Sequence, residues 1–189
     1  SIKTLIPRNE TEFIVEKFIE HSNRKPKNIS VIDIGTGSCC IPISIILNSS
    51  NINSFDAIDP HTFEIAKKNI SSYKLEGRIN LYNIGIEGIL STLNKKYDII
   101  TANLPYIPED KKIKELNFEP YEALYAKDDG LHYIKMLIGI LPVIIKKNGI
   151  ALIEIDPNHT DYLNDLKNFN VSIFKDLNNL DRIAEIKIR

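Results

Sequence analysis

Short apolar runs rich in β-branched residues recur along this chain, and segments with helical periodicity separate most of them. The runs, each expected to form a buried strand, cover residues 29–34, 54–59, 79–84, 97–102 and 149–155. A run that is apolar on both faces is typical of a parallel strand covered by helices on both sides of its sheet. The alternation therefore predicts a doubly wound α/β sheet.

Helices are expected between these strands, where apolar residues return at intervals of three and four. They cover residues 9–22, 39–48, 63–73 and 131–145. Pro142 is expected to kink the last of them, because proline cannot donate a backbone hydrogen bond. Residues 103–128 form a long connection with little periodicity. The final apolar runs, 171–176 and 182–188, predict a pair of antiparallel strands.

Composition excludes several classes of protein. The chain has 189 residues, enough for one good core, and its net charge of −1 gives no strong attraction to nucleic acid or to an anionic membrane. Its two cysteines, Cys39 and Cys40, are adjacent and supply neither a disulfide framework nor a spaced zinc pattern. No apolar run approaches the length of a membrane-spanning helix, and the start has no signal-peptide pattern. We expect a monomer without a metal, located in the cytoplasm or in an organelle matrix.

Three polar segments follow predicted strands and share one edge of the sheet. "DIGTGS" ends the first strand, "AIDP" ends the second, and "NLPY" follows the fourth. Ligands of doubly wound sheets bind outside the carboxyl ends of the strands, so these segments are the candidate site. The four histidines are scattered and are expected to be solvated or to cap helices; they are His21, His61, His132 and His159.

The first two segments suit a nucleoside. Gly35 and Gly37 let the backbone turn sharply and approach a ligand, although Cys39 stands where a dinucleotide-binding loop has its third glycine. A plain strand-to-helix turn is the alternative. Asp59 can accept both hydroxyls of a ribose, or it can cap the helix that begins near Pro60. The neighbouring glycine loop favours the ribose, and a nucleoside without pyrophosphate does not need the third glycine.

The third segment suits a planar nitrogen substrate. The side-chain amide of Asn103 and the carbonyl of Leu104 can each accept an N–H, and Tyr106 can cover the plane, while Pro105 stiffens the loop. The lone pair of an amide or an exocyclic amine is conjugated and reacts poorly. Two acceptors that localise it on nitrogen should lower the barrier to methyl transfer.

With these residues in place, the sequence resembles the release-factor glutamine N5-methyltransferases of the HemK/PrmC type. The segments that carry the resemblance are "LIPRNETEFIVE" (5–16), "VIDIGTGS", "AIDP", "ANLPYIPE", "FEPYEAL", "DDGLHYIKMLI", "LIEI" and "DLNNLDRIAEI". The glycine loop and the Asn-x-Pro-Tyr segment occur in many methyltransferases, whereas the first segment and the EPxxAL and DGL segments are much more specific.

The resemblance implies a Rossmann-like class I methyltransferase with a mostly parallel seven-stranded sheet. S-adenosyl-L-methionine would donate the methyl group, S-adenosyl-L-homocysteine would be the product, and the acceptor would be the glutamine in the GGQ loop of a peptide-chain release factor. The donor would be held by Asp33, Gly35, Thr36, Gly37, Ser38, Cys39, Asp59, Ile86 and Asn103. The catalytic segment would be Asn103, Leu104, Pro105 and Tyr106.

The resemblance also implies a domain organisation. Residues 1–28 would be the linker segment with the first helix of the catalytic domain, and 29–189 the rest of that domain. We expect the family's N-terminal helical domain to be absent. Arg8 and Glu12 are interpreted as structural or donor-pocket supports.

The sequence departs from the family pattern at several positions. Cys39 replaces the last loop glycine, which should place a side chain beside the donor. Gly85 stands where the family has an Asp near the adenine, so that contact would fall to the backbone or to Ile86. Leu104 replaces the first proline of the NPPY signature. After the fifth predicted strand, Asp156 and His159 also depart from the pattern.

Two other functions remain open at this point. An N6-adenine RNA or DNA methyltransferase would use a similar Asn-x-Pro-Tyr site, but it would need a basic face and an exposed or flipped base. The near-neutral charge argues against that partner. A degenerate domain that binds a donor or a protein without turnover is the second alternative, and the substitutions at Cys39, Gly85 and Leu104 motivate it.

Overall fold

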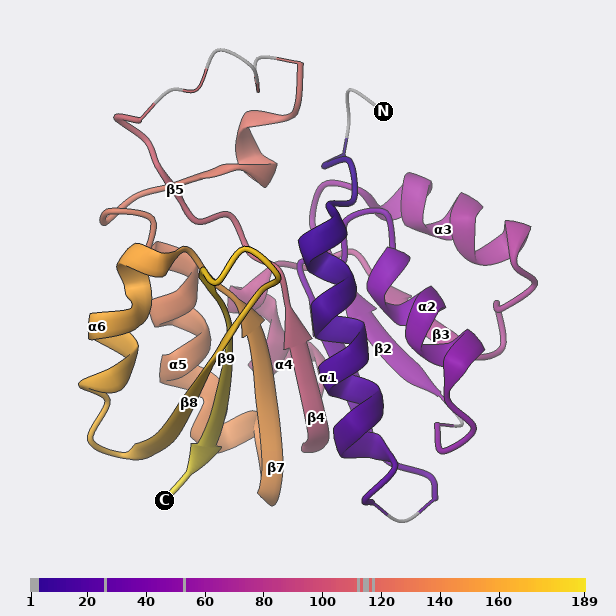
Figure 1. Cartoon of the computed structure of the whole chain (residues 1–189). Helices are drawn as coiled ribbons and strands as arrows, with labels where there is room; N and C mark the ends of the chain where they lie inside the picture. The colour runs from indigo at the N-terminus through magenta and orange to yellow at the C-terminus, as the bar shows by residue number, and fades with distance from the viewer. Residues whose placement is uncertain (1–3, 26, 53, 112, 114–115, 117) are drawn as a thin grey trace.

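The computed structural model describes residues 4–25, 27–52, 54–111, 113, 116 and 118–189. Its main strands are β1 (Val31–Ile34), β2 (Phe55–Ile58), β3 (Ile79–Tyr82), β4 (Tyr97–Ala102), β7 (Ile145–Glu154), β8 (Phe169–Lys175) and β9 (Asp181–Ile188). Within the described residues they form one seven-stranded sheet in the order β3-β2-β1-β4-β7-β9-β8 (Figure 1). β9 runs antiparallel to β7 and β8, and the pairs from β3 to β7 are parallel. The predicted fold class is confirmed.

Helices cover both faces of this sheet, as Figure 1 shows. One face carries α1 (Glu12–Ser22), α2 (Cys40–Asn48) and α3 (Phe63–Ser72), which pack into one buried apolar cluster. The other face carries α4 (Ile89–Thr92), α5 (His132–Ile144) and α6 (Thr160–Asn164), which pack into a second cluster. Every residue of β1 and β2 is buried, which explains why their sequences are apolar on both faces.

The structure differs from the sequence prediction in several elements. β7 begins at Ile145 instead of 149, because the polar residues 146–148 are part of the strand. Its pairing with β4 shifts register between Tyr97 and Ile99. Pro142 falls in the last turn of α5, so little helix follows it. The sequence prediction missed α4 and α6, which are too short to show periodicity.

The connection 103–128 also contains a short parallel pair, β5 (Ile107–Pro108) with β6 (Tyr125–Ala126). After it the chain makes a tight turn in which Gly130 has φ +85°. A Cβ at Gly130 would lie 2.0 Å from the carbonyl oxygen of Tyr106 and 3.1 Å from Nε2 of His159. His159 is only 2% exposed and its Nε2 lies 3.2 Å from the carbonyl oxygen of Asp129, so the expectation of a solvated or capping histidine is wrong there. This turn presses against the loop that follows β4.

We expect Gly130→Ala to lower the free energy of unfolding by more than about 2 kcal/mol, because it combines a left-handed φ with a backbone clash. Gly139→Ala is the matched control. Gly139 lies inside α5, and a Cβ added there would have nothing within 4 Å, so alanine should stabilise by about 0.5–1 kcal/mol. Urea denaturation measures both. Equal effects of the two substitutions would contradict the packing described for the turn.

Candidate active site

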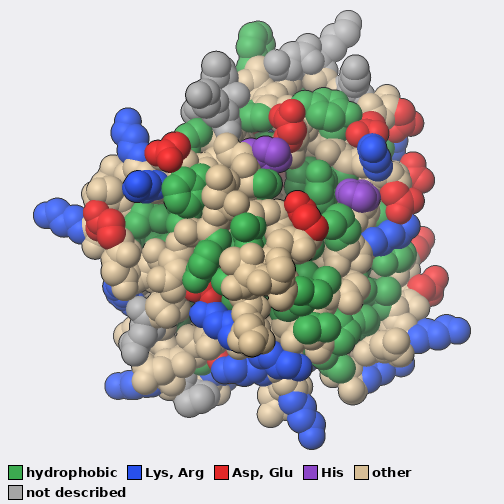
Figure 2. Space-filling view, turned by 180° about the vertical axis from the view of Figure 1, so that it is seen from behind, with side chains coloured by type: hydrophobic (Ala, Val, Ile, Leu, Met, Phe, Trp, Pro, Cys, Tyr) green, Lys and Arg blue, Asp and Glu red, His purple; other side chains and the backbone are tan. Residues whose placement is uncertain are grey.

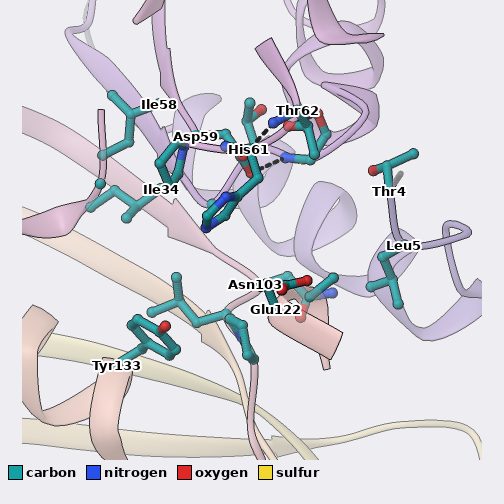
Figure 3. A pocket seen from close by; sticks show the side chains of 18 of the residues that line it. Thr4, Leu5, Ile34, Ile58, Asp59, His61, Thr62, Asn103, Glu122 and Tyr133 are labelled. Carbon is teal, nitrogen blue, oxygen red and sulfur yellow. Dashed lines mark hydrogen bonds between the residues drawn. The ribbon is translucent and has the colours of Figure 1, made fainter. Parts of the chain in front are cut away.

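A cavity of about 660 Å³ opens at the carboxyl ends of β1, β2 and β4. Its position matches the point where the connections after β1 and β4 leave toward opposite faces of the sheet. Figure 3 shows Asp59 and His61 on one side of this cavity, Asn103 and Glu122 across from them, and Thr4 and Leu5 at a third side. The predicted site residues that line it are Gly35, Thr36, Gly37, Ser38, Asp59, Ile86, Asn103, Leu104 and Pro105.

Cys39 does not line the cavity, so the expectation that its side chain would lie beside the ligand is wrong. Its side chain is fully buried in the cluster beneath α1, α2 and α3. The backbone of Cys39 is left-handed, with φ +67°, a conformation that glycine adopts most easily. The position therefore fits the family's glycine by its backbone, while its side chain packs into the core and leaves the cavity unobstructed.

Asp33 is a second predicted ligand that lies outside the cavity. It is fully buried in β1, and its Oδ1 accepts a hydrogen bond of 2.6 Å from Oγ1 of Thr101, its partner in β4. Burial raises the pKa of Asp33 from its ordinary value of 3.8 to about 7, although the bond from Thr101 opposes the shift. Asp33 thus joins two strands beneath the glycine loop instead of facing a ligand.

Asp59 clamps the glycine loop against the start of α3. Its Oδ2 accepts from the backbone N–H of Gly37 at 3.0 Å, and its Oδ1 accepts from the N–H groups of His61 and Thr62 at 2.7 and 2.9 Å. Thr62 in turn donates from Oγ1 to the carbonyl of Gly37 at 2.7 Å. These bonds hold the turn before α3, whose N-cap is Thr62 without a side-chain cap bond, so the alternative that Asp59 caps the helix is wrong. The Asp59 residue still borders the cavity.

The glycine loop leaves little room for side chains. A Cβ at Gly35, where φ is +74°, would lie 3.0 Å from Cδ2 of Leu104. Thr4 and Thr36 also line the cavity, but their hydroxyl oxygens are buried and have no hydrogen-bond partner among the described residues.

Asn103 presents its amide with a defined orientation. Its Nδ2 donates to Oε2 of Glu154 at 2.9 Å and to Oγ1 of Thr11 at 3.2 Å. No described residue donates to its Oδ1, and Asn103 lines the cavity. The orientation therefore leaves a hydrogen-bond acceptor available to a ligand.

Tyr106 does not lie where the sequence analysis expected it, above a planar substrate. It does not line the cavity, because its hydroxyl turns to the protein and donates to Oε1 of Glu154 at 3.2 Å. Burial, together with the nearby Glu154, raises the pKa of Tyr106, so its hydroxyl stays protonated and able to donate. Tyr106 supports the loop that carries Asn103.

Glu154 does not line the cavity, but it holds residues that do, and sequence reasoning assigned it no role. It ends β7, is 1% exposed, and accepts hydrogen bonds from Thr11 at 3.0 Å as well as from Asn103 and Tyr106. Burial raises the pKa of Glu154, and the bonds from Thr11 and Tyr106 oppose the shift. Glu154 lies in the "LIEI" segment and Thr11 in the "LIPRNETEFIVE" segment. Neither segment shows in the sequence that the two residues are in contact.

The segment before α1 forms one wall of the cavity. Thr4, Leu5, Pro7 and Thr11 line it. Arg8 forms an ion pair with Glu119, and the backbone N–H of Ile6 donates to the same carboxylate at 3.1 Å. The supporting role expected for Arg8 agrees with this contact, whereas Glu12 is exposed and does not border the cavity.

Two other classes of site find no support in the described part of the chain. None of its helices is long and apolar enough to cross a bilayer. Nor do its His, Cys, Asp and Glu side chains gather in threes as metal ligands would.

We expect Asp33→Asn to remove a pH dependence of stability. Between pH 3.8 and about 7 the folded protein keeps a proton on Asp33 that the unfolded chain releases. The free energy of unfolding of the natural protein should therefore fall, relative to that of the variant, as the pH rises through this window. Urea denaturation at about pH 4.5 and about pH 7.5 measures it. A difference between the two proteins that does not change with pH would contradict the assignment.

Known sequences of methyltransferases match this chain. The sequence model of the ribosomal protein L11 methyltransferase (PrmA) family matches residues 11–106. A release factor glutamine methyltransferase of Flavobacterium psychrophilum is 34% identical over 201 residues, which cover 98% of this chain and 68% of that protein.

Solved structures share the fold. The crystal structure of a protein-(glutamine-N5) methyltransferase (release factor-specific) from Alicyclobacillus acidocaldarius matches with a TM-score of 0.60 and 26% identity, over 97% of this chain and 95% of that one. A Streptococcus mutans protein in complex with SAH matches with a TM-score of 0.65 and 16% identity, over 98% of this chain and 100% of that one.

Proposed function

Because the chain belongs to the release factor glutamine methyltransferase family, we propose that it methylates a glutamine side-chain amide in a peptide-chain release factor. The glutamine is the one in the GGQ loop, and the donor is S-adenosyl-L-methionine. The match to the L11 methyltransferase family ends at residue 106, whereas the similarity to the Flavobacterium relative runs through 98% of the chain. The residues after 106 therefore favour a release factor over the L11 protein as the substrate.

The cavity has the properties that this donor needs. Its volume of about 660 Å³ lies within the range of small-molecule sites, about 300–1,000 Å³. Gly35 and Gly37 allow the backbone to approach the donor closely. Asp59 at the cavity wall suits the ribose hydroxyls. The S. mutans structure with SAH is a protein of the same fold in complex with such a nucleoside.

When bound, S-adenosyl-L-methionine supplies a methyl group on a sulfonium: the substrate nitrogen bonds to the methyl carbon as the carbon–sulfur bond breaks, sulfur keeps the electron pair, and one N–H proton passes to water. The chain's own residues prepare that nitrogen. Oδ1 of Asn103 accepts one of its N–H groups, and the carbonyl of Leu104 accepts the other. These two acceptors hold the nitrogen toward the donor and favour a localised lone pair. The free Oδ1 of Asn103 on the cavity wall is the observation that carries the proposal.

The distribution of charge supports a protein substrate. On the face that Figure 2 draws, acidic and basic side chains are interspersed in the upper part, toward the carboxyl edge of the sheet, and lysine and arginine side chains gather along the lower edge. A nucleic-acid substrate would favour basic side chains near the site. The protein acts as a monomer in the cytoplasm or in an organelle matrix, without a nucleic-acid partner.

Mass spectrometry of a release factor incubated with the protein and S-adenosyl-L-methionine tests the function. We expect one added methyl group on the GGQ glutamine. Asn103→Ala should lower the rate about a hundredfold and change the donor dissociation constant much less, because it mainly removes an acceptor for the target amide. Asn83→Ala is the matched control, since Asn83 is exposed after β3 and does not border the cavity.

Two results would contradict the proposal. Methylation of RNA or DNA, with none of the release factor, would indicate a nucleic-acid methyltransferase. Calorimetry that detects no donor binding to the folded protein, even at millimolar donor, would indicate a binding domain without turnover.

A further inference from the structure

Glu154, at the end of β7, is bonded to two other segments that are far apart in the sequence. Thr11 belongs to η1 (Asn9–Thr11), directly before α1, while Asn103 and Tyr106 follow β4. All three donate a hydrogen bond to the Glu154 carboxylate, at 3.0, 2.9 and 3.2 Å. The carboxylate is 1% exposed, so these protein donors take the place of water around it. The network links the first segment of the chain to the loop that borders the cavity.

The chemistry of a carboxylate determines which way the Asn103 amide faces. Oε2 of Glu154 accepts from Thr11 and Oε1 accepts from Tyr106, so this group acts as an acceptor, whereas a side-chain amide has a donor end and an acceptor end. Asn103 can therefore meet Glu154 only through Nδ2. Oγ1 of Thr11 gives its proton to Glu154 and so accepts from the same Nδ2 at 3.2 Å. Both neighbours of Nδ2 thus act as acceptors, and a rotation of the amide by 180° would lose both bonds and oppose oxygen to oxygen.

We propose that Glu154 and Thr11 are positioning residues that lock the Asn103 amide with Oδ1 toward the cavity, and that this lock selects a substrate nitrogen carrying N–H. The consequence for the reaction rests on the proposed function, whereas the lock itself does not. A carboxamide presents N–H to Oδ1 and is accepted. A carboxylate of the same shape, such as glutamate in place of the target glutamine, presents oxygen to oxygen and is rejected.

An exchange of donor and acceptor between two residues tests the lock. In Asn103→Asp, two carboxylates face each other, so we expect kcat to fall about a hundredfold. Adding Glu154→Gln restores a hydrogen bond between the two positions, now in the opposite direction. The amide NH₂ at position 154 donates to the carboxylate at position 103, and the amide oxygen at position 154 can still accept from Tyr106. The other oxygen of that carboxylate remains an acceptor for the substrate. The double variant should therefore be at least about tenfold faster than Asn103→Asp alone, a strong coupling between the two sites.

Control variants separate positioning from a general effect on stability. Glu154→Gln alone should lower kcat by about tenfold, because Asn103 can then rotate, while the donor dissociation constant changes less than about threefold. Glu185→Gln alters another buried glutamate, in β9, which pairs with His21. Combined with Asn103→Asp it should give no recovery. Melting temperatures of all variants show whether recovered activity merely follows recovered folding.

Hydrogen exchange of the Asn103 side chain gives a readout that needs no methyl transfer. In the natural protein the NH₂ protons of Asn103, followed by ¹⁵N-edited NMR, should exchange with water at least about tenfold more slowly than those of exposed Asn83. Thr11→Val should reduce this protection, and Thr11→Ser should retain it, because serine keeps the hydroxyl.

The outcomes are distinguishable. Slow exchange at Asn103 together with recovery in the Asn103→Asp, Glu154→Gln double variant would support the lock. Exchange at Asn103 as fast as at Asn83, or a double variant no faster than Asn103→Asp, would overturn it. If the natural protein fails to methylate a release factor, the proposed function fails, and the exchange experiment still decides the orientation of the amide.

Discussion

A carboxylate buried in a protein needs hydrogen-bond donors around it, because it only accepts and because leaving it bare costs free energy. Asp33, Asp59 and Glu154 occupy such positions at or near the ends of β1, β2 and β7. Glu154 takes its donors from the first segment and the β4 loop. Asp59 takes one donor from the glycine loop and two from the turn that follows it. Oδ1 of Asp33 takes one from the neighbouring strand, while its Oδ2 has no partner among the described residues. The conformation of the cavity wall therefore depends on three acidic side chains rather than on the loops alone.

This arrangement explains how one edge of the sheet can serve two chemical tasks. The glycine loop, clamped by Asp59 through the N–H of Gly37, forms a rigid surface for a nucleoside. The loop with Asn103 is held from the opposite side by Glu154, so its amide oxygen meets the same cavity. Preorganised acceptors need not reorient during the reaction, which is the main way in which such a site lowers a barrier. The family membership and the geometry lead to the same reaction.

The sequence predicted the strands, the longer helices and the meeting of three polar segments well, because period and apolar content reflect burial directly. The sequence prediction failed where the local backbone conformation determines the direction of a side chain. Cys39 was expected beside the ligand, but its left-handed φ belongs to a turn that places the thiol in the core. Glu154 could not be recognised, since one acid in "LIEI" resembles an ordinary strand, and its partner Thr11 lies 143 residues away. The buried His159 was missed because the turn at Gly130 that packs on it has no periodicity.

The central claim is that a sulfur nucleoside lies between Asp59 and Asn103. A crystal structure of the protein with S-adenosyl-L-homocysteine tests it most directly. In that structure the ribose hydroxyls should lie within hydrogen-bond distance of the Asp59 carboxylate, and the sulfur should lie on the side of the cavity that Oδ1 of Asn103 faces. A nucleoside bound at another surface, or Asn103 with Nδ2 toward the cavity, would contradict it.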